Sequence, residues 1–190
     1  MMNRRVLYTR LRAALVLYTC SAGMVSANAA TQPAPLDPGA RVQVGFSPAG
    51  TAQQTVLDAI ASARQEVLVA AFNFTSRPVA KALLDAKKRG VEVRVVADKK
   101  ANSNYTAVTY LANQGVAVAL NDNYKYMHQK FLVVDGQSVE TGSFNYSAGA
   151  AKSSNAENVI WLINVPSVAA QYRQEFVRLW QESTPLTPRY

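Results

Sequence analysis

Apolar residues along positions 41–182 show two different spacings, which alternate from one segment to the next. Short segments with alternating or continuous apolar residues, typical of β-strands, are separated by longer segments with helical periodicity. The pattern predicts strands at residues 41–46, 66–74, 91–97 and 116–120, and helices at 51–63, 77–89 and 102–114. Thr51 and Ser76 are candidate N-caps of the first two helices. An alternation of this kind predicts a sheet covered by helices.

The pattern changes after residue 120. Residues 128–134 and 138–141 are expected to be strands, and they flank Asp135-Gly136-Gln137, a turn sequence that predicts a hairpin. A further strand is expected at 158–163 and a closing helix at 166–182. We therefore expect the α/β class, with a single-domain mixed β-sheet flanked by helices.

The first 29 residues have a different character. Four arginines precede an apolar run at 13–18, and small residues then lead to Ala27-Asn28-Ala29, which suits signal peptidase. The apolar run is shorter than the roughly 20 residues of a membrane-spanning helix. We predict a signal peptide at residues 1–29 and a periplasmic or secreted protein without stable membrane association. An uncleaved anchor and a mitochondrial presequence are the alternatives. The proline-containing residues 30–40 are expected to form an exposed linker, residues 41–183 one domain and residues 184–190 a tail.

Composition limits the chemistry. The chain has one cysteine, Cys20 in the predicted leader, and one histidine, His128. The mature protein would therefore lack disulfides and thiolate nucleophiles, and no carboxylate cluster suggests a metal site. We expect no metal and no cofactor. Cleavage would remove four of 20 basic residues and none of 12 acidic ones, which leaves a net charge of +4. A charge of this size is compatible with a phosphate-rich partner without demonstrating one.

Four polar residues form two pairs, and the members of each pair are two positions apart. His128 and Lys130 are two residues apart, as are Ser143 and Asn145, and alternate residues of a strand share a face. A neutral imidazole can attack phosphorus and form a covalent phosphoramidate. Lys130, Ser143 and Asn145 would hold the non-bridging oxygens. The spacing therefore predicts a phosphodiester site around His128.

Two acidic residues near these four have different explanations. Glu157 could accept a hydrogen bond from the second imidazole nitrogen and thereby orient His128. The alternative is an ordinary solvated glutamate at the start of a strand. Asp135 is followed by Gly136 and is sufficiently explained as a turn residue. It lies an odd number of positions from Lys130, which points it to the opposite face of a strand.

The motif His128-x-Lys130-x4-Asp135-x6-Gly142-Ser143 resembles the signature of the phospholipase D superfamily. Its continuation through Asn145 to Glu157 is similar to the small, secreted bacterial endonuclease branch of that superfamily. The resemblance covers roughly residues 41–182. It implies a phospholipase D-like fold with His128 as the nucleophile and Glu157 orienting it. It also implies phosphate binding by Lys130, Ser143 and Asn145 and a structural role for Asp135. Small members carry the motif once and pair as homodimers, whereas larger members carry it twice.

The single histidine supports the pairing of two chains independently of the family resemblance. After the first imidazole attacks, the leaving oxygen needs a proton and water must later be activated, tasks that suit a second imidazole near neutral pH. We therefore expect a homodimer that places His128 of both chains on opposite sides of one phosphate at the two-fold interface. The alternative is Glu157 as the acid, which is weaker because its unperturbed pKa is about 4.3.

Two polar segments are candidate nucleic-acid contacts. Lys99 and Lys100 follow a predicted strand and could touch the phosphate backbone, while Tyr124-Lys125-Tyr126 could stack bases. Solvated turns are the alternative for both. The expected function is a metal-independent, non-specific endonuclease acting on DNA and possibly RNA through a phosphohistidine. The alternatives are a phospholipase D-type lipid phosphodiesterase or transphosphatidylase, and a non-catalytic nucleic-acid binder.

Overall fold

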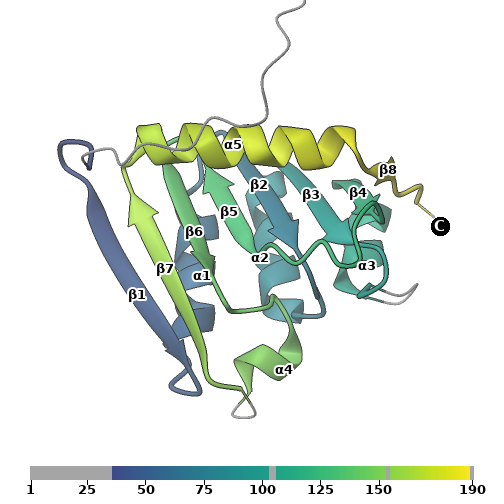
Figure 1. Ribbon diagram of the computed structural model, residues 1–190, viewed down its shortest axis with the longest axis horizontal. Helices are drawn as coiled ribbons and strands as arrows, with labels where there is room; N and C mark the ends of the chain where they lie inside the picture. Colours follow the sequence, from purple (N-terminus) through teal and green to yellow (C-terminus); the bar gives the residue numbers. More distant parts are fainter. Residues whose placement is uncertain (1–35, 103–105, 153–154, 189–190) are drawn as a thin grey trace, which may run out of the picture. The chain divides into compact units, whose positions relative to one another are not determined.

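The computed structural model describes residues 36–102, 106–152 and 155–188. Its eight strands form one sheet in the order β1-β7-β6-β5-β2-β3-β4-β8 (Figure 1). The strands are β1 Arg41–Ser47, β2 Glu66–Ala71, β3 Glu92–Asp98, β4 Ala117–Asn121, β5 Phe131–Val134, β6 Ser138–Gly142, β7 Glu157–Ile163 and β8 Thr184–Pro185. The helices are α1 Thr51–Ser62, α2 Arg77–Lys88, α3 Ala107–Asn113, α4 Ala148–Ala151 and α5 Pro166–Gln181. The predicted fold class is confirmed.

The sheet combines a parallel and an antiparallel part. β2, β3 and β4 are parallel neighbours, and α2 and α3 connect them. β5, β6, β7 and β1 add to the other side of β2 in antiparallel fashion, so that β1 pairs with β7 rather than with β2. The predicted hairpin is formed by β5 and β6. The carboxyl ends of β2, β3 and β4 therefore lie at one edge, together with the start of β5.

Helices cover both faces of this sheet (Figure 1). α1, α2 and α3 lie on one face, over the larger core, to which Val67, Val69 and Leu132 contribute. α5 crosses the other face over β2 to β6 and buries Phe176 and Leu179 against Leu68. Apolar residues on β2 and β5 alternate between the two cores, as expected for strands that are buried on both faces. Within the described ranges, no helix is both long and apolar enough to cross a membrane.

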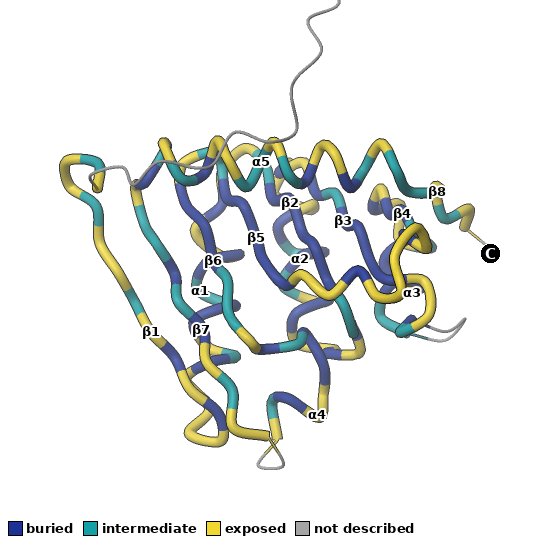
Figure 2. Tube along the Cα trace, viewed as in Figure 1, coloured by how far each residue is buried: buried dark blue, intermediate teal, exposed yellow. Residues whose placement is uncertain are grey.

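β1 is the least covered strand of the sheet. Figure 2 shows it largely exposed at one border. Val42, Val44 and Phe46 are 52%, 56% and 54% exposed, and all three occupy the face opposite α1. Gly45 points toward α1, where a Cβ atom would lie 2.5 Å from the Thr51 carbonyl oxygen. The absence of a side chain at Gly45 therefore allows α1 to pack closely against β1.

Local differences from the expected elements have simple causes. Ser76 caps α2 by accepting from the Val79 N–H, whereas Gly50 precedes α1 and Thr51 is its first residue. The Thr51 hydroxyl instead accepts from the Phe46 N–H at 2.8 Å. α3 begins at Ala107 rather than at 102, and β5 begins at Phe131 rather than at 128. The Asn102 side chain bonds to the backbone of Phe72, Phe74 and Asp98, and Asp98 accepts from the Met127 N–H just before His128.

The ends of the domain also differ from the prediction. The leader at residues 1–29 lies outside the described residues. Residues 36–40, expected to be linker, are anchored to the domain because Asp37 accepts from Ser167 and the Pro38 carbonyl accepts from Asn164. Residues 184–186, expected to be tail, join the sheet through β8 and through the Leu186 N–H, which bonds to Val118. The folded unit is therefore longer at both ends than residues 41–183.

A buried carboxyl group lies beneath the segment after β6. Glu140 on β6 is 1% exposed, and its carboxyl is hydrogen-bonded to the Tyr146 hydroxyl at 2.6 Å. Burial raises the pKa of Glu140 to about 8 from its ordinary 4.5, and it also raises the pKa of Tyr146. At neutral pH the folded protein therefore keeps a proton on Glu140 that the unfolded chain releases.

This proton predicts a loss of stability as the pH rises from about 4.5 to about 8. Between pH 4.5 and about 8 the native state binds more protons than the unfolded state at Glu140. The free energy of unfolding should therefore fall as pH rises, by up to about 1.4 kcal/mol per pH unit. We expect Glu140→Gln to remove this slope, measured by urea unfolding at pH 5, 6.5 and 8. Glu92→Gln, at an exposed position of β3, is the control. Parallel pH profiles of wild type and Glu140→Gln would contradict the assignment.

Candidate active site

His128 and Lys130 lie side by side at the edge where β2 and β3 end. Both belong to the segment just before β5, not to the strand itself as expected, yet their side chains still lie together. The Lys130 ammonium donates to the His128 carbonyl oxygen at 2.7 Å and lies 3.3 Å from His128 Nδ1. His128 is exposed, whereas Lys130 is only 7% exposed.

Burial gives Lys130 the properties of an anion-binding group. Desolvation lowers its pKa, and the negative charge of Glu157 opposes that effect. A partly dehydrated ammonium group interacts more strongly with an incoming phosphate oxygen than a hydrated one does. Lys130 is thus placed to hold a phosphate against the exposed imidazole of His128.

Ser143 and Glu157 form a second polar pair at the neighbouring strands. Ser143 follows β6, and its hydroxyl donates to the Glu157 carboxylate at 2.5 Å and accepts from the Asn158 N–H at 3.0 Å. The Glu157 carboxylate also accepts from Asn155. The expected hydrogen bond between Glu157 and His128 is not formed within the described part of this chain. In this chain the Glu157 carboxylate bonds to Ser143 and Asn155 instead, and its role in orienting His128 stays a prediction.

Gly142 and Asn145 shape the segment that carries Ser143. At Gly142 a Cβ atom would lie 2.2 Å from the Asn158 carbonyl oxygen, so only glycine allows β6 to approach β7 this closely. Asn145 is half-buried, and its side-chain oxygen is buried without a hydrogen-bond partner. The following residue, Tyr146, accepts backbone hydrogen bonds from Thr75 and Ser76, which holds the segment against the start of α2.

Asp135 lies at the opposite end of β5 from His128. It occupies the turn between β5 and β6 with a φ of 53°, a left-handed conformation that aspartate tolerates better than most residues. Its carboxylate accepts from the backbone N–H groups of Arg64, Gln65 and Glu66 at 2.7–3.2 Å. The residue therefore ties the hairpin to the start of β2 and is remote from the chemistry at His128.

Phe72 is a site residue that the sequence reasoning missed. Its ring centroid lies 4.4 Å from that of His128 and 5.1 Å from the Lys130 ammonium. Asn102 holds the Phe72 carbonyl oxygen with its side-chain amide at 2.7 Å. The available signal was positional, because Phe72 directly follows the buried strand β2 and ligands gather at the carboxyl ends of such strands.

The candidate nucleic-acid contacts already have partners within the chain. Lys99 forms an ion pair with Asp122 at 2.5 Å, and Lys100 donates to the carbonyl oxygens of Tyr124 and Lys125. The Tyr124 hydroxyl bonds to Glu182 and Arg178 on the side of α5. These contacts hold the segment before His128 in place. A contact of Lys99, Lys100, Tyr124 or Lys125 with nucleic acid stays a prediction.

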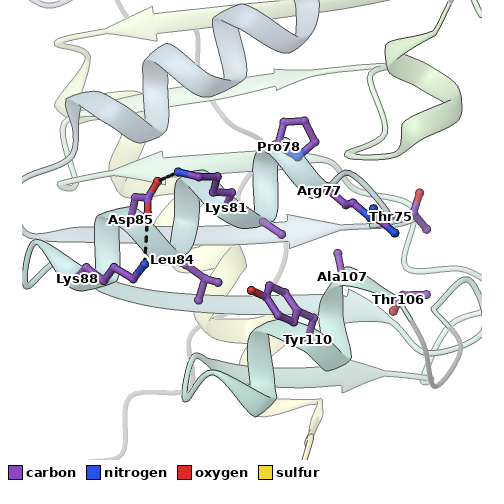
Figure 3. Close-up of a pocket in the computed structure, with 11 residues that line it drawn as sticks. Thr75, Arg77, Pro78, Lys81, Leu84, Asp85, Lys88, Thr106, Ala107 and Tyr110 are labelled. Carbon is purple, nitrogen blue, oxygen red and sulfur yellow. Dashed lines mark hydrogen bonds and ion pairs between the residues drawn. The ribbon is translucent and has the colours of Figure 1, made fainter.

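Two cavities differ in their relation to His128. One of about 430 Å³ is lined by His128, Lys130, Thr141 and Gly142 and by polar residues of α5. A larger one of about 820 Å³ lies between α2 and α3, where Figure 3 shows Leu84, Ala107 and Tyr110 among its walls. His128 does not line this larger cavity. Among the residues described, no group of three or more His, Cys, Asp or Glu side chains could hold a metal ion.

Comparisons with known proteins agree with this geometry. A family model described as "Cardiolipin synthase, PLD-like domain" matches residues 56–180. The mitochondrial cardiolipin hydrolase of Xenopus laevis is 39% identical over 130 residues, which are 66% of this chain and 59% of that protein. A phospholipase D of Rickettsia bellii is 30% identical over 138 residues, or 72% of this chain and 68% of that protein.

A solved structure matches more completely. The phospholipase D family member Nuc from Salmonella typhimurium superposes with a TM-score of 0.75 at 36% identity. The match covers 78% of this chain and 99% of Nuc. NucT from Helicobacter pylori, at 22% identity and a TM-score of 0.69, has the same fold. The chain thus corresponds to almost the whole of Nuc, whereas it spans about three fifths of the Xenopus cardiolipin hydrolase.

Proposed function

The chain belongs to the phospholipase D superfamily of phosphodiesterases, and from this we propose that it is a metal-independent nuclease of low sequence specificity. The observation that carries the proposal is the exposed imidazole of His128 beside the desolvated ammonium of Lys130. Asn145 on the neighbouring segment adds an amide donor, and Ser143 adds a second donor when its hydroxyl turns from Glu157 to the phosphate. The site combines a nucleophile with fixed positive charge, which are the two elements that phosphoryl transfer needs.

The proposed reaction has two displacements. Nε2 of His128 attacks phosphorus, an N–P bond forms, and the P–O bond to the leaving oxygen breaks. The leaving oxygen takes a proton from the imidazolium of the partner subunit's His128. That imidazole, now neutral, takes a proton from water as the water oxygen attacks phosphorus and the N–P bond breaks. Lys130 neutralises the non-bridging oxygens in both steps.

Attack through Nε2 requires one particular tautomer of His128. In the described contact the Lys130 ammonium approaches Nδ1, which favours Nδ1 as an acceptor and a proton on Nε2. The nucleophilic tautomer has its proton on Nδ1 instead. Phosphate binding supports the change, because the anion draws the Lys130 ammonium away from Nδ1 toward its own oxygens.

Nucleic acid is the proposed substrate for two reasons. Residues 141–158 resemble the small endonuclease branch of the superfamily, and the match to Nuc covers 99% of the length of Nuc. Backbone phosphates are bound without reading the base sequence, which agrees with a site made of Lys130 and neutral donors. We further propose that the mature protein acts in the periplasm or outside the cell, because the first 29 residues resemble an export signal.

Lipid phosphodiesters are the second candidate substrate. The names of the cardiolipin hydrolase relatives favour it. The apolar residues that β1 exposes also favour it, since they could rest on a membrane surface. Substrate choice is therefore the property to measure directly.

The test uses purified residues 30–190 in excess chelator. We expect cleavage of labelled oligonucleotides and no phosphatidic acid from vesicles of phosphatidylcholine and cardiolipin. Release of phosphatidic acid without any oligonucleotide cleavage would contradict the nuclease proposal and indicate a lipid phosphodiesterase. Cleavage only after addition of a divalent cation would contradict the phosphohistidine mechanism.

We also propose that the active form is a homodimer. The described apolar face consists of Val42, Val44 and Phe46 on β1 with Ile160 and Leu162 on β7, and it carries no charged side chain. Ile160 pairs with Thr141, which lines the same cavity as His128. A second copy covering this face would bury the exposed half of three large apolar side chains, at about half of the ~1.5–3 kcal/mol gained by fully burying each one. It would also place its own His128 near the same cavity.

A further inference from the structure

Phe72 is the centre of a row of three side chains. Tyr126, His128 and Lys130 are spaced two residues apart in the segment before β5. All three lie against the Phe72 ring, with Tyr126 at 5.7 Å between centroids in an edge-on arrangement. His128 therefore shares its contact with Phe72 with the phosphate-binding Lys130 and with the aromatic ring of Tyr126.

The backbone that carries Tyr126 is held from several directions. The buried residue Met127 donates its N–H to the Asp98 carboxylate at 2.8 Å. Lys100 holds the carbonyl oxygens of Tyr124 and Lys125, and the Gln129 side chain bonds to Glu175 on α5. A segment held by this many bonds presents its side chains in nearly fixed positions, so little conformational entropy remains to be lost on binding.

Tyr126 is nevertheless open to solvent. It is 52% exposed, whereas Tyr124 is 37% exposed and has its hydroxyl bonded to Glu182 and Arg178. The ammonium group of Lys125 lies 5.9 Å from the centroid of the Tyr126 ring. An exposed aromatic ring near a nucleophile, with an ammonium group over the ring and a backbone held by hydrogen bonds, matches the surfaces on which unpaired bases stack.

We propose that Tyr126, in contact with Phe72, is a stacking site for an unpaired nucleobase next to the phosphate that His128 attacks. The proposal rests on the nuclease function proposed above and specifies its substrate as single-stranded or locally unpaired nucleic acid. A base inside a duplex already has both faces stacked and must be extruded, which costs a few kcal/mol. Lys125 would then accompany the backbone on the same side as the stacked base.

The test compares cleavage of one fluorescent oligonucleotide as a single strand and as a duplex. Loss of one stacked base predicts that Tyr126→Ala lowers kcat/KM on the single strand about 5- to 100-fold. Tyr126→Phe keeps the ring and should retain the wild-type rate within a factor of about two. The matched control is Tyr110→Ala on α3, because Tyr110 is also 52% exposed and lines the cavity away from His128 (Figure 3). It should change neither rate.

A substrate change completes the experiment. Once the cleavage position is mapped, an abasic residue is placed at each nucleotide that flanks it. One of these should slow the wild type as much as Tyr126→Ala does, and should slow Tyr126→Ala no further. Equal rates of Tyr126→Ala and Tyr126→Phe on the single strand would overturn the stacking site while leaving the nuclease intact. A wild type that cleaves neither form would overturn the nuclease function and the stacking site together.

Discussion

Replacing His128 by alanine is expected to abolish phosphodiester cleavage, with kcat/KM lowered by about 10⁴-fold or more. The reason is that the imidazole supplies both the nucleophile of one subunit and the acid of the other in the proposed dimer. The measurement is cleavage of a labelled single strand in excess chelator. The fold should survive, because the His128 ring is exposed.

A covalent intermediate gives this prediction a second readout. Wild-type protein mixed with substrate labelled at the scissile phosphate should carry label after rapid denaturation. The label should be lost in acid and kept in base, as expected of a phosphoramidate, and His128→Ala should carry none. Folding of both proteins is compared by circular dichroism and urea unfolding. Appreciable metal-free cleavage by a folded His128→Ala protein would exclude His128 as the nucleophile.

The pairing of His128 with Lys130 followed from the sequence because it depends only on local geometry. Two-residue spacing places side chains on one side of any extended backbone, so the pairing holds even though the residues precede β5 instead of belonging to it. The turn position of Asp135 could also be predicted, because it depends only on the neighbouring residues. The order of strands in the sheet could not be predicted in this way, since the pairing of β1 with β7 joins residues more than a hundred positions apart.

The interactions that depend on long-range contacts were missed. No periodicity places Phe72 against three residues of the segment before β5, because that contact requires β2 and β5 to be neighbours. The hydrogen bond between Glu157 and Ser143 was also not foreseen, because it depends on the register in which β6 and β7 pair. β8 is too short for a periodic signal and forms because its backbone groups meet the open edge of β4.

Placing a carboxylate in the apolar face is expected to separate the proposed dimer. Val44 is 56% exposed on β1 and lies between Val42 and Phe46 on the same face. Burying an unpaired charge there would outweigh the apolar contacts that a second copy provides. We expect Val44→Asp to sediment as a monomer. Because it would lose the general acid of its partner, its kcat/KM should fall by about 10²- to 10⁴-fold.

The control and a mixing experiment separate dimerisation from damage to the fold. Tyr110→Asp introduces the same charge at an equally exposed position on α3, and should stay dimeric and active. Wild type mixed with equal His128→Ala and allowed to exchange subunits should lose about half of its activity per wild-type chain, because a two-fold site needs His128 from both chains. A monomeric Val44→Asp protein with full activity would exclude the shared site. It would leave Glu157, at 2.5 Å from the Ser143 hydroxyl, as the acid within one chain.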